Sequence, residues 1–257
     1  MFNKDTVGGT LSVALILCVV CSIVVASSAV LLRPMQQANK DLDRKTNILA
    51  AAGLLKEGVS VDSQFEDITV RAVDLNTGKF TDSVDVAIYD QRKASKDPAQ
   101  SEELVGSDDL AKISRRANIA TVYIVEGSEG IDKVILPVKG YGLWSTLYGF
   151  IALEGDLNTV AGLGFYEHAE TPGLGGEVDN PVWKAKWVGK KVFDSEGKTA
   201  LTIIKGSVDA SRDGSEYQID GLSGATLTSR GVSNLIQFWL GDNGFAPFLV
   251  KLKEGEA

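Results

Sequence analysis

Residues 220–229 read DGLSGATLTS, and an apolar helical stripe follows them directly. The stripe occupies positions i, i+3, i+4, i+7 and i+8 of one helix face, namely Val232, Leu235, Ile236, Trp239 and Leu240. Residues 217–219 ahead of the loop fit a short strand, and Gly241 stands where a helix C-cap belongs. The stretch therefore predicts a strand, a glycine-rich hydroxyl loop and the N-terminus of an amphipathic helix.

A loop of this kind can bind an anion. The first backbone N–H groups of a helix have no partner within the helix, and the helix dipole favours negative charge there. Gly221 and Gly224 allow the backbone to approach a ligand closely. The alternative is that one of the hydroxyl residues only caps the helix. The loop is neither a Walker loop, because no Gly-Lys-Ser/Thr follows, nor a dinucleotide fingerprint, because its glycine spacing differs.

Outward from this unit, the chain mixes strand and helix patterns. Strands are predicted at residues 84–89, 121–125, 133–138, 147–153, 159–165 and 201–205. Helices are predicted at residues 36–55, at 108–115 with Asp108 as its cap, and at 181–186 behind Asn180 and Pro181. Residues 93–106 are polar and predict a surface excursion. Because the helices are separated from a run of antiparallel-looking strands, the sequence predicts an α+β fold.

An uncharged segment at residues 6–32 predicts a membrane anchor. Its 27 residues carry no charged side chain, and about 20 apolar residues suffice to cross the hydrocarbon core. Lys4 and the small residues near Ala26 also fit a cleaved signal peptide, but the run is longer than a usual signal core. We therefore expect a single transmembrane helix at residues 1–33, a connecting helix at 34–60 and a globular domain at 61–257.

The globular part is acidic and poor in metal ligands. Without Lys4, Asp5 and Arg33, the 26 basic and 34 acidic residues of the chain become 24 and 33, a net charge of −9. Such a domain is a poor nucleic-acid binder, because phosphate contacts dominate that affinity. Cys18 and Cys21 share one face of the anchor helix and are expected to be apolar fillers, because two thiols cannot complete a cluster site. His168, the only histidine, is expected to be structural, and no metal site is expected.

The order DGLSGAT at residues 220–226 resembles the flavinylation motif of FMN-binding domains. The stretches GYGLWS at residues 140–145 and HAETPGLGG at residues 168–176 resemble the same family. Together with the anchor and QANK at residues 37–40, they resemble the C subunits of Na+-translocating NADH:quinone reductases nearly from end to end. The nearest alternative is the G subunits of Rnf electron-transport complexes, which share the flavinylation motif and the ETPGLG stretch.

The resemblance implies a covalent FMN whose phosphate is esterified to the last threonine of the motif. That residue is Thr226, and Thr228 is its nearest competitor. Trp144 is expected to pack against the isoalloxazine ring, although a tryptophan of the core is the alternative, and Glu170 and Thr171 are expected to hydrogen-bond polar edges of the ring. The other expected cofactor-binding residues are Ser223, Gly224, Ala225, Leu143, Ser145, Leu174 and Gly175. No catalytic side chain is expected, because a flavin performs its own redox chemistry.

The resemblance further implies an electron-transfer subunit that relays electrons toward ubiquinone with coupled sodium export. The chain has no dinucleotide fingerprint, so the NADH site is expected in another subunit. Expected partners are the other reductase subunits, a flavin transferase during maturation and membrane lipid. A non-catalytic membrane FMN-binding module and an unflavinated structural anchor are the remaining alternatives.

Two features disagree about the side of the membrane on which the globular domain lies. Arg33, Lys40, Arg44 and Lys45 follow the anchor and only Lys4 precedes it, which favours a cytoplasmic domain. The resemblance implies a flavin domain on the periplasmic side of the bacterial inner membrane. Because long domains translocate largely regardless of charge, we expect the periplasmic arrangement.

Overall fold

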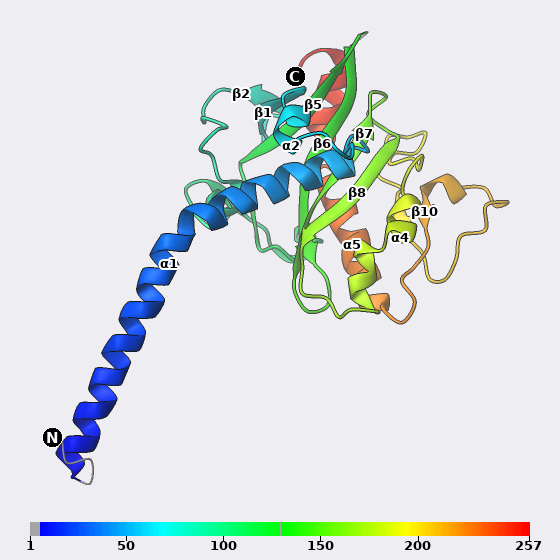
Figure 1. The fold of residues 1–257 in the computed structure, drawn as a ribbon. Helices are drawn as coiled ribbons and strands as arrows, with labels where there is room; N and C mark the ends of the chain where they lie inside the picture. The colour runs from blue at the N-terminus through cyan, green and yellow to red at the C-terminus, as the bar shows by residue number, and fades with distance from the viewer. Residues whose placement is uncertain (1–5, 129) are drawn as a thin grey trace. The chain divides into compact units, whose positions relative to one another are not determined.

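The computed structural model describes residues 6–128 and 130–257 and divides the chain into two compact units, residues 1–43 and 44–257. The described part of the first unit is a single α-helix, α1 (Val7–Ala51), whose last turns belong to the second unit (Figure 1). The large apolar side chains of α1 from Val7 to Met35 are exposed, and α1 is the one helix among the described residues that is long and apolar enough to cross a membrane. Cys18 and Cys21 are exposed on it as free thiols.

The helix predicted at residues 36–55 is the continuation of α1. The helix passes through Pro34 without interruption and ends at Ala51. Gly53, with φ +68°, donates its N–H to Ala50 O at 3.1 Å, and Leu54 donates to Leu49 O at 2.8 Å. A left-handed glycine that turns the chain away after the last carbonyls is a common way to end a helix. Gly53 therefore ends the helix four residues before the predicted end at residue 55.

The second unit is built on an antiparallel sheet with the strand order β2-β1-β5-β6-β7-β8 (Figure 1). The bounds in chain order are β1 (Ile68–Asp74), β2 (Lys79–Thr81), β5 (Ile119–Gly127), β6 (Gly130–Tyr141), β7 (Thr146–Glu154) and β8 (Val160–Glu167). The predicted strands at 121–125, 133–138, 147–153 and 159–165 all lie in it. The prediction of an α+β fold is confirmed.

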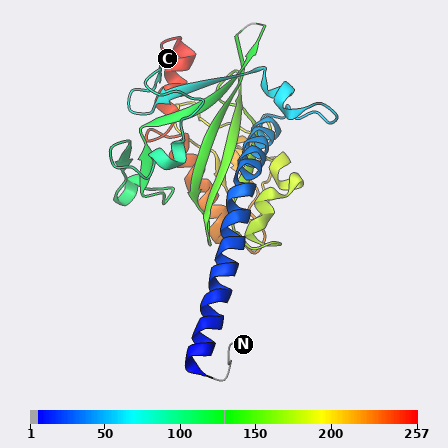
Figure 2. The ribbon, with the colours of Figure 1, turned by 60° about the vertical axis from the view of Figure 1, so that its left-hand side comes forward.

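Helix α5 (Thr226–Trp239) covers one face of the sheet (Figures 1 and 2). All five residues of its predicted apolar stripe are buried, in one cluster with β-strand residues such as Leu136 and Val138. Burying one leucine of the stripe, such as Leu235, stabilises the fold by about 1.5–3 kcal/mol. A Cβ on Gly140 would lie 2.7 Å from Leu235 Cβ, so this glycine lets α5 approach β6 closely.

The opposite face of the sheet has its own cluster. Ile48 and Leu49, in the last turns of α1, are fully buried there with Ile135 and Phe150 of the sheet. The unit is completed by short elements: α2 (Val61–Phe65), α3 (Gln91–Ala94), β3 (Ser101–Glu103), β4 (Arg115–Ala117), α4 (Pro181–Ala185), β9 (Thr202–Ile203), β10 (Gln218–Ile219) and α6 (Ala246–Glu254). Asn180 Oδ1 accepts a hydrogen bond from Val182 N at 2.9 Å, which confirms the predicted cap of α4.

Two predicted elements are wrong. Residues 84–89 form turns rather than a strand, because Asp85 accepts from Ala87 N through its carboxylate and from Tyr89 N through its carbonyl, both at 2.9 Å. Residues 108–115 are not a helix, because the Asp109 carboxylate accepts from Ile113 N at 2.7 Å and from Ser114 N at 2.9 Å. In both places an aspartate hydrogen-bonds the nearby backbone in place of regular structure.

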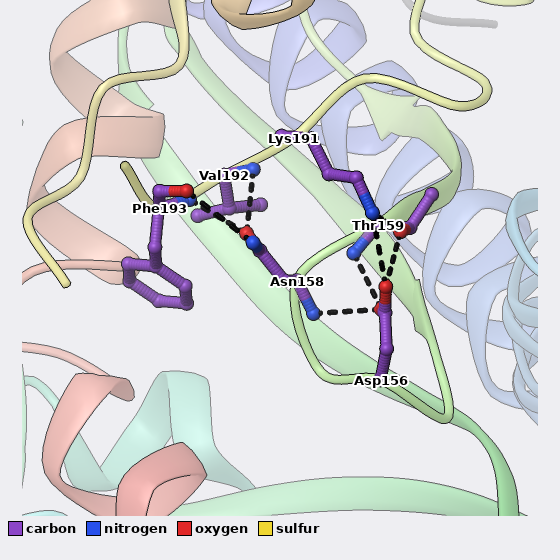
Figure 3. Close-up of polar contacts among 6 residues, drawn as sticks. All are labelled: Asp156, Asn158, Thr159, Lys191, Val192 and Phe193. Carbon is purple, nitrogen blue, oxygen red and sulfur yellow. Dashed lines mark hydrogen bonds and ion pairs between the residues drawn. The ribbon is translucent and has the colours of Figure 1, made fainter. Parts of the chain in front are cut away.

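Side chains of the β7–β8 turn hydrogen-bond residues 191–193, which precede β9 in the chain (Figure 3). Asn158 Oδ1 accepts from Val192 N at 3.0 Å and from Phe193 N at 2.7 Å. The Asp156 carboxylate accepts from Thr159 N and from Lys191 Nζ, at 2.7 and 3.1 Å. Although burial alone raises the pKa of Asp156, the hydrogen bonds from Thr159, Asn158 and Lys191 lower it overall. This polar cluster fixes residues 191–193 to the sheet, and β9 then runs on to one wall of the site described next.

Candidate functional site

The predicted strand–loop–helix unit is present. Strand β10 ends at Ile219 and α5 begins at Thr226, with Ala225 as its N-cap residue and no side chain capping it. Gly224 has φ +72°, a left-handed conformation that glycine adopts without steric cost, and an added Cβ there would lie 3.0 Å from Leu174 Cδ2. The loop at 220–225 therefore meets the loop that contains Leu174, and it leaves the start of α5 open.

Asp220 anchors the beginning of this loop. Its carboxylate accepts from Lys186 Nζ at 2.5 Å and from Val208 N at 2.8 Å, and its carbonyl accepts from Trp183 Nε1 at 2.9 Å. Burial alone raises the pKa of Asp220, but the bonds from Lys186 and Val208 lower it. The first residue of the motif is thus a structural anchor whose charge is already balanced.

The hydroxyl residues of the motif face different ways. Thr226 and Ser223 are exposed. Thr228 is fully buried and donates its hydroxyl to Glu170 Oε2 at 2.7 Å, and Ser229 is buried with its hydroxyl accepting from Leu222 N at 3.0 Å. Ser229 therefore holds the loop onto the helix, and Thr226 alone presents a solvent-facing hydroxyl within the first turn of α5.

Glu170 joins three segments of the chain. It is 5% exposed, and its Oε1 accepts from the amides of Leu143, Trp144 and Ser145 at 3.1, 3.0 and 3.3 Å. Its Oε2 accepts the Thr228 hydroxyl. The carboxylate therefore ties the 143–145 turn to α5, while its own backbone belongs to the loop after β8.

Two glycines make room for this carboxylate. A Cβ on Gly142 would lie 2.7 Å from Glu170 Oε1, and a Cβ on Gly175 would lie 2.7 Å from Oε2 and 2.6 Å from Thr228 Oγ1. Real Cβ atoms do not approach that closely, so any side chain at either position displaces the carboxylate. Gly142 of the GYGLWS stretch and Gly175 of the GLGG stretch thus make room for the Glu170 contacts.

The pKa of Glu170 is lowered. Burial by itself raises it, but the hydrogen bonds from the Thr228 hydroxyl and from the amides of Trp144, Leu143 and Ser145 favour the charged form more strongly. No ion pair to Glu170 occurs within residues 6–128 and 130–257. The site therefore contains a buried anion that is stabilised by hydrogen bonds alone.

Apolar side chains lie exposed on the loops that Glu170 organises. Trp144 is 66% exposed, which rules out the alternative that it is a core tryptophan. Leu143 and Leu174 are 36% and 45% exposed, and Leu227, beside Thr226, is 53% exposed. Large exposed apolar side chains gathered near one polar group are typical of a binding surface.

The remaining predicted residues stabilise the loops around Glu170 or are buried among them. Ser145 Oγ accepts from Ala169 N at 2.7 Å, and the carbonyl of the exposed Thr171 accepts from Gly176 N at 2.9 Å. Ala225 and Gly175 are buried. His168 lies 2.7 Å from Asp179 Oδ2 through Nε2, and its Nδ1 accepts from Glu170 N at 3.2 Å, which supports a structural histidine. No cluster of three possible metal ligands occurs in the described part of the chain.

A groove of about 300 Å³ beside Thr226 was not predicted. It is lined by residues of α5 that include Arg230, and by Lys205 and Gly206 from the segment after β9. Arg230 stands four residues after Thr226, and this spacing places both residues on one helix face. The spacing alone would have indicated from the sequence that Arg230 lies near Thr226. Lys205 could not be placed from the sequence, because its position depends on the pairing of β9 with β10.

We predict that Glu170→Ala lowers the free energy of unfolding of the full chain in detergent by about 3 kcal/mol, because it leaves buried donors without an acceptor. Glu170→Gln, which keeps the shape, is expected to cost about 1 kcal/mol at neutral pH. Chemical denaturation followed by tryptophan fluorescence measures both values.

Because the pKa of Glu170 is lowered, the contribution of this residue to the free energy of unfolding should depend on pH. A carboxyl whose folded-state pKa is lowered stabilises the fold above its unfolded pKa, about 4.3, and that stabilisation is lost as the pH falls below it. The stability gap between wild type and Glu170→Gln should therefore shrink on acidification below that value. The exposed Glu216→Gln serves as control, and a gap that does not change with pH contradicts a charged Glu170.

Comparison with known proteins places this geometry in a family. The sequence profile of the FMN-binding domain matches residues 142–241, from the Gly142 turn to the end of α5. The C subunit of the Na(+)-translocating NADH-quinone reductase from Pseudomonas aeruginosa is 55% identical over 261 residues, covering 100% of both chains. Its counterpart from Vibrio campbellii is 51% identical over 258 residues, covering 98% of both.

Solved structures agree with the sequence comparison. The crystal structure of NqrC from Shewanella oneidensis has a TM-score of 0.75 at 38% identity, covering 84% of this chain and 97% of that one. The counterpart from Parabacteroides distasonis has a TM-score of 0.66 at 28% identity, covering 85% and 96%. With full-length identity above one half and a shared fold, the chain belongs to the family of C subunits of the Na+-translocating NADH-quinone reductase, an oxidoreductase complex, and contains an FMN-binding domain.

Proposed function

We propose that this chain is the electron-transfer subunit that carries FMN in phosphoester linkage on Thr226 and relays electrons toward ubiquinone with coupled sodium export. The observation that carries the proposal is the contrast between two threonines in one motif. Thr226 is exposed at the first residue of α5, whereas Thr228 is buried and bonded to Glu170. Only the first can be reached by a modifying enzyme in the folded domain.

The surroundings of Thr226 fit a phosphate. The first backbone N–H groups of α5 have no intrahelical acceptor, no side chain caps them at Ala225, and the helix dipole favours an anion at this end. The groove beside Thr226 is lined by Lys205 and Arg230 and by no carboxylate. These features support the expected roles of Ser223, Gly224 and Ala225 as the loop that faces the phosphate.

The exposed apolar residues fit the ring of FMN. Trp144 and Leu174 belong to the loops that Glu170 draws toward α5, and Leu227 follows the attachment residue. Covering these side chains with an aromatic ring removes apolar surface from water. Because the Glu170 carboxylate faces protein donors, its contribution to the ring site is to position the loops, and the exposed Thr171 is the residue free to meet a polar edge of the ring.

Attachment is a phosphoryl transfer to the Thr226 hydroxyl. The donor is a flavin dinucleotide, in which the FMN phosphate is joined to a second phosphate by an anhydride bond. The Oγ–phosphorus bond forms as that anhydride bond breaks, and the second nucleoside phosphate departs with the electron pair. The hydroxyl proton goes to a base of the flavin transferase, because the groove lining offers no carboxylate or histidine. The bound FMN then supplies the redox chemistry, while NADH oxidation belongs to another subunit of the hetero-oligomeric complex.

The proposed location is the bacterial inner membrane, with α1 crossing the bilayer among lipid and the flavin domain in the periplasm. The exposed apolar surface of α1 supports the crossing. The basic residues after the span favour the opposite orientation, but this bias weakens for long domains.

We predict that Thr226→Ala abolishes covalent flavin without unfolding the domain, because it removes an exposed hydroxyl and opens no core cavity. In-gel flavin fluorescence under denaturing conditions and the mass of the intact chain measure attachment. The matched variant Thr228→Val should keep covalent flavin and lose about 1–3 kcal/mol of stability, because Glu170 loses a buried donor. Flavin that persists on Thr226→Ala and disappears from Thr228→Val reverses the assignment.

We predict that Trp144→Ala keeps the covalent FMN but changes its absorption spectrum and reduction potential, because attachment depends on Thr226 and the ring environment depends on packing. A spectroelectrochemical titration of the full chain measures both. The matched control is Trp187→Phe, a change at a fully buried tryptophan whose indole N–H makes no hydrogen bond with the described residues. A potential identical to that of wild type places Trp144 away from the ring.

The periplasmic arrangement predicts the behaviour of two C-terminal fusions. Alkaline phosphatase joined after Ala257 should be active, because it folds outside the cytoplasm, and a fluorescent protein that matures only in the cytoplasm should stay dark. The opposite pattern means that the positive charges after the anchor determine orientation.

A further inference from the structure

A polar face of α5 runs away from Thr226 along one wall of the groove. Its residues stand at helical spacing, positions i, i+3, i+4, i+7, i+8 and i+11, namely Thr226, Ser229, Arg230, Ser233, Asn234 and Gln237. The opposite wall is the segment 202–206, which includes β9. The groove therefore starts at the proposed attachment residue and has walls from two separate parts of the chain.

Two cations in this groove have no partner among the described residues. Neither Lys205 nor Arg230 makes a side-chain hydrogen bond or an ion pair with any residue that the structure describes, and no carboxylate lines the groove. Lys186 and Lys191 are instead paired, with Asp220 and Asp156. In a domain with a net charge of −9, two such cations in one groove form a local positive site.

The backbone fixes this pair relative to Thr226. Arg230 lies one helical turn after Thr226 on the same face. On the other wall, Gly221 N donates to Gly206 O at 2.9 Å, and an added Cβ on Gly221 would lie 2.5 Å from Ile204 O. Gly221 thus holds the Lys205 segment against the loop that precedes Thr226.

We infer that Lys205 and Arg230 are an anion-binding pair that receives the phosphate of the flavin nucleotide at Thr226. The inference rests on the proposed function, since it names the residues that hold the ligand of that site. The pair attracts the phosphate before attachment and balances the single negative charge that the phosphodiester keeps afterwards. The phosphate is thereby held beside the Thr226 hydroxyl.

The test uses the full chain in detergent, produced without flavin transferase so that Thr226 is unmodified. Binding of FMN and of riboflavin, which differ by the phosphate, is measured by quenching of flavin fluorescence. Wild type should bind FMN more tightly than riboflavin, and Lys205→Gln and Arg230→Gln should each reduce that preference about 2- to 5-fold. Riboflavin binding should not change.

Controls separate charge from structure. Lys253→Gln removes an exposed cation of α6 and should leave the FMN preference intact. Inorganic phosphate should weaken FMN binding more than sodium chloride at equal ionic strength does, and it should not affect riboflavin. Arg230→Lys should restore most of the preference, because it restores the charge.

Any of three outcomes would reject the inference that Lys205 and Arg230 bind the phosphate. The first is equal affinity of wild type for FMN and riboflavin. The second is an unchanged FMN preference in the Lys205→Gln, Arg230→Gln double variant, and the third is no binding of either flavin at millimolar concentration. These outcomes are distinct from failure of the proposed function. Covalent flavin on Thr226→Ala rejects the attachment residue, whereas covalent flavin on Thr226 together with an unchanged FMN preference rejects only the cation pair.

Discussion

The site depends on one buried carboxylate, that of Glu170. Burying an anion is costly unless its oxygens are hydrogen-bonded, and here three backbone amides and one hydroxyl meet that requirement. The amides belong to the turn between β6 and β7, the hydroxyl belongs to α5, and the carboxylate itself follows β8. Because all three segments must be in place for the charge to be buried, the local folding of each is coupled to the others.

This coupling sets which hydroxyl of the motif is available for chemistry. Residues two apart on an α-helix point about 200° apart, so fixing Thr228 inward toward Glu170 turns Thr226 outward. Arg230, four residues after Thr226, then faces the same groove. The order of residues along one helix thus separates the buried Thr228 from the exposed Thr226, and no side chain caps the helix at Ala225.

The sequence predicted those features whose cause is local. The apolar stripe on α5 and the strands β5 to β8 were predicted from local sequence patterns, and both are confirmed. The prediction of a strand at 84–89 was wrong because the Asp85 carboxylate accepts a hydrogen bond from the backbone two residues further on. The pattern of apolar residues gives no sign of that bond. Strand β1 and helix α6 were not predicted, although Val73 and Phe248 are fully buried. Glu170 was recognised by its motif, but its contacts join residues 58 and 27 positions apart, beyond the reach of any local pattern.

An acidic domain can hold a phosphate only if its own carboxylates are screened from the site. Asp220, the charged residue of the motif, is paired with Lys186 and with a backbone amide, and Glu170 is enclosed by donors. Thr226 stands at the N-terminus of α5 and lines one groove with the cations Lys205 and Arg230, and no carboxylate lines that groove. Under the proposed function, the exposed apolar surface of Trp144 and Leu174 adds affinity only for a phosphate that brings a large planar group with it. Under the proposed function, recognition therefore requires both halves of FMN, and the proposed phosphoester on Thr226 makes that selection permanent.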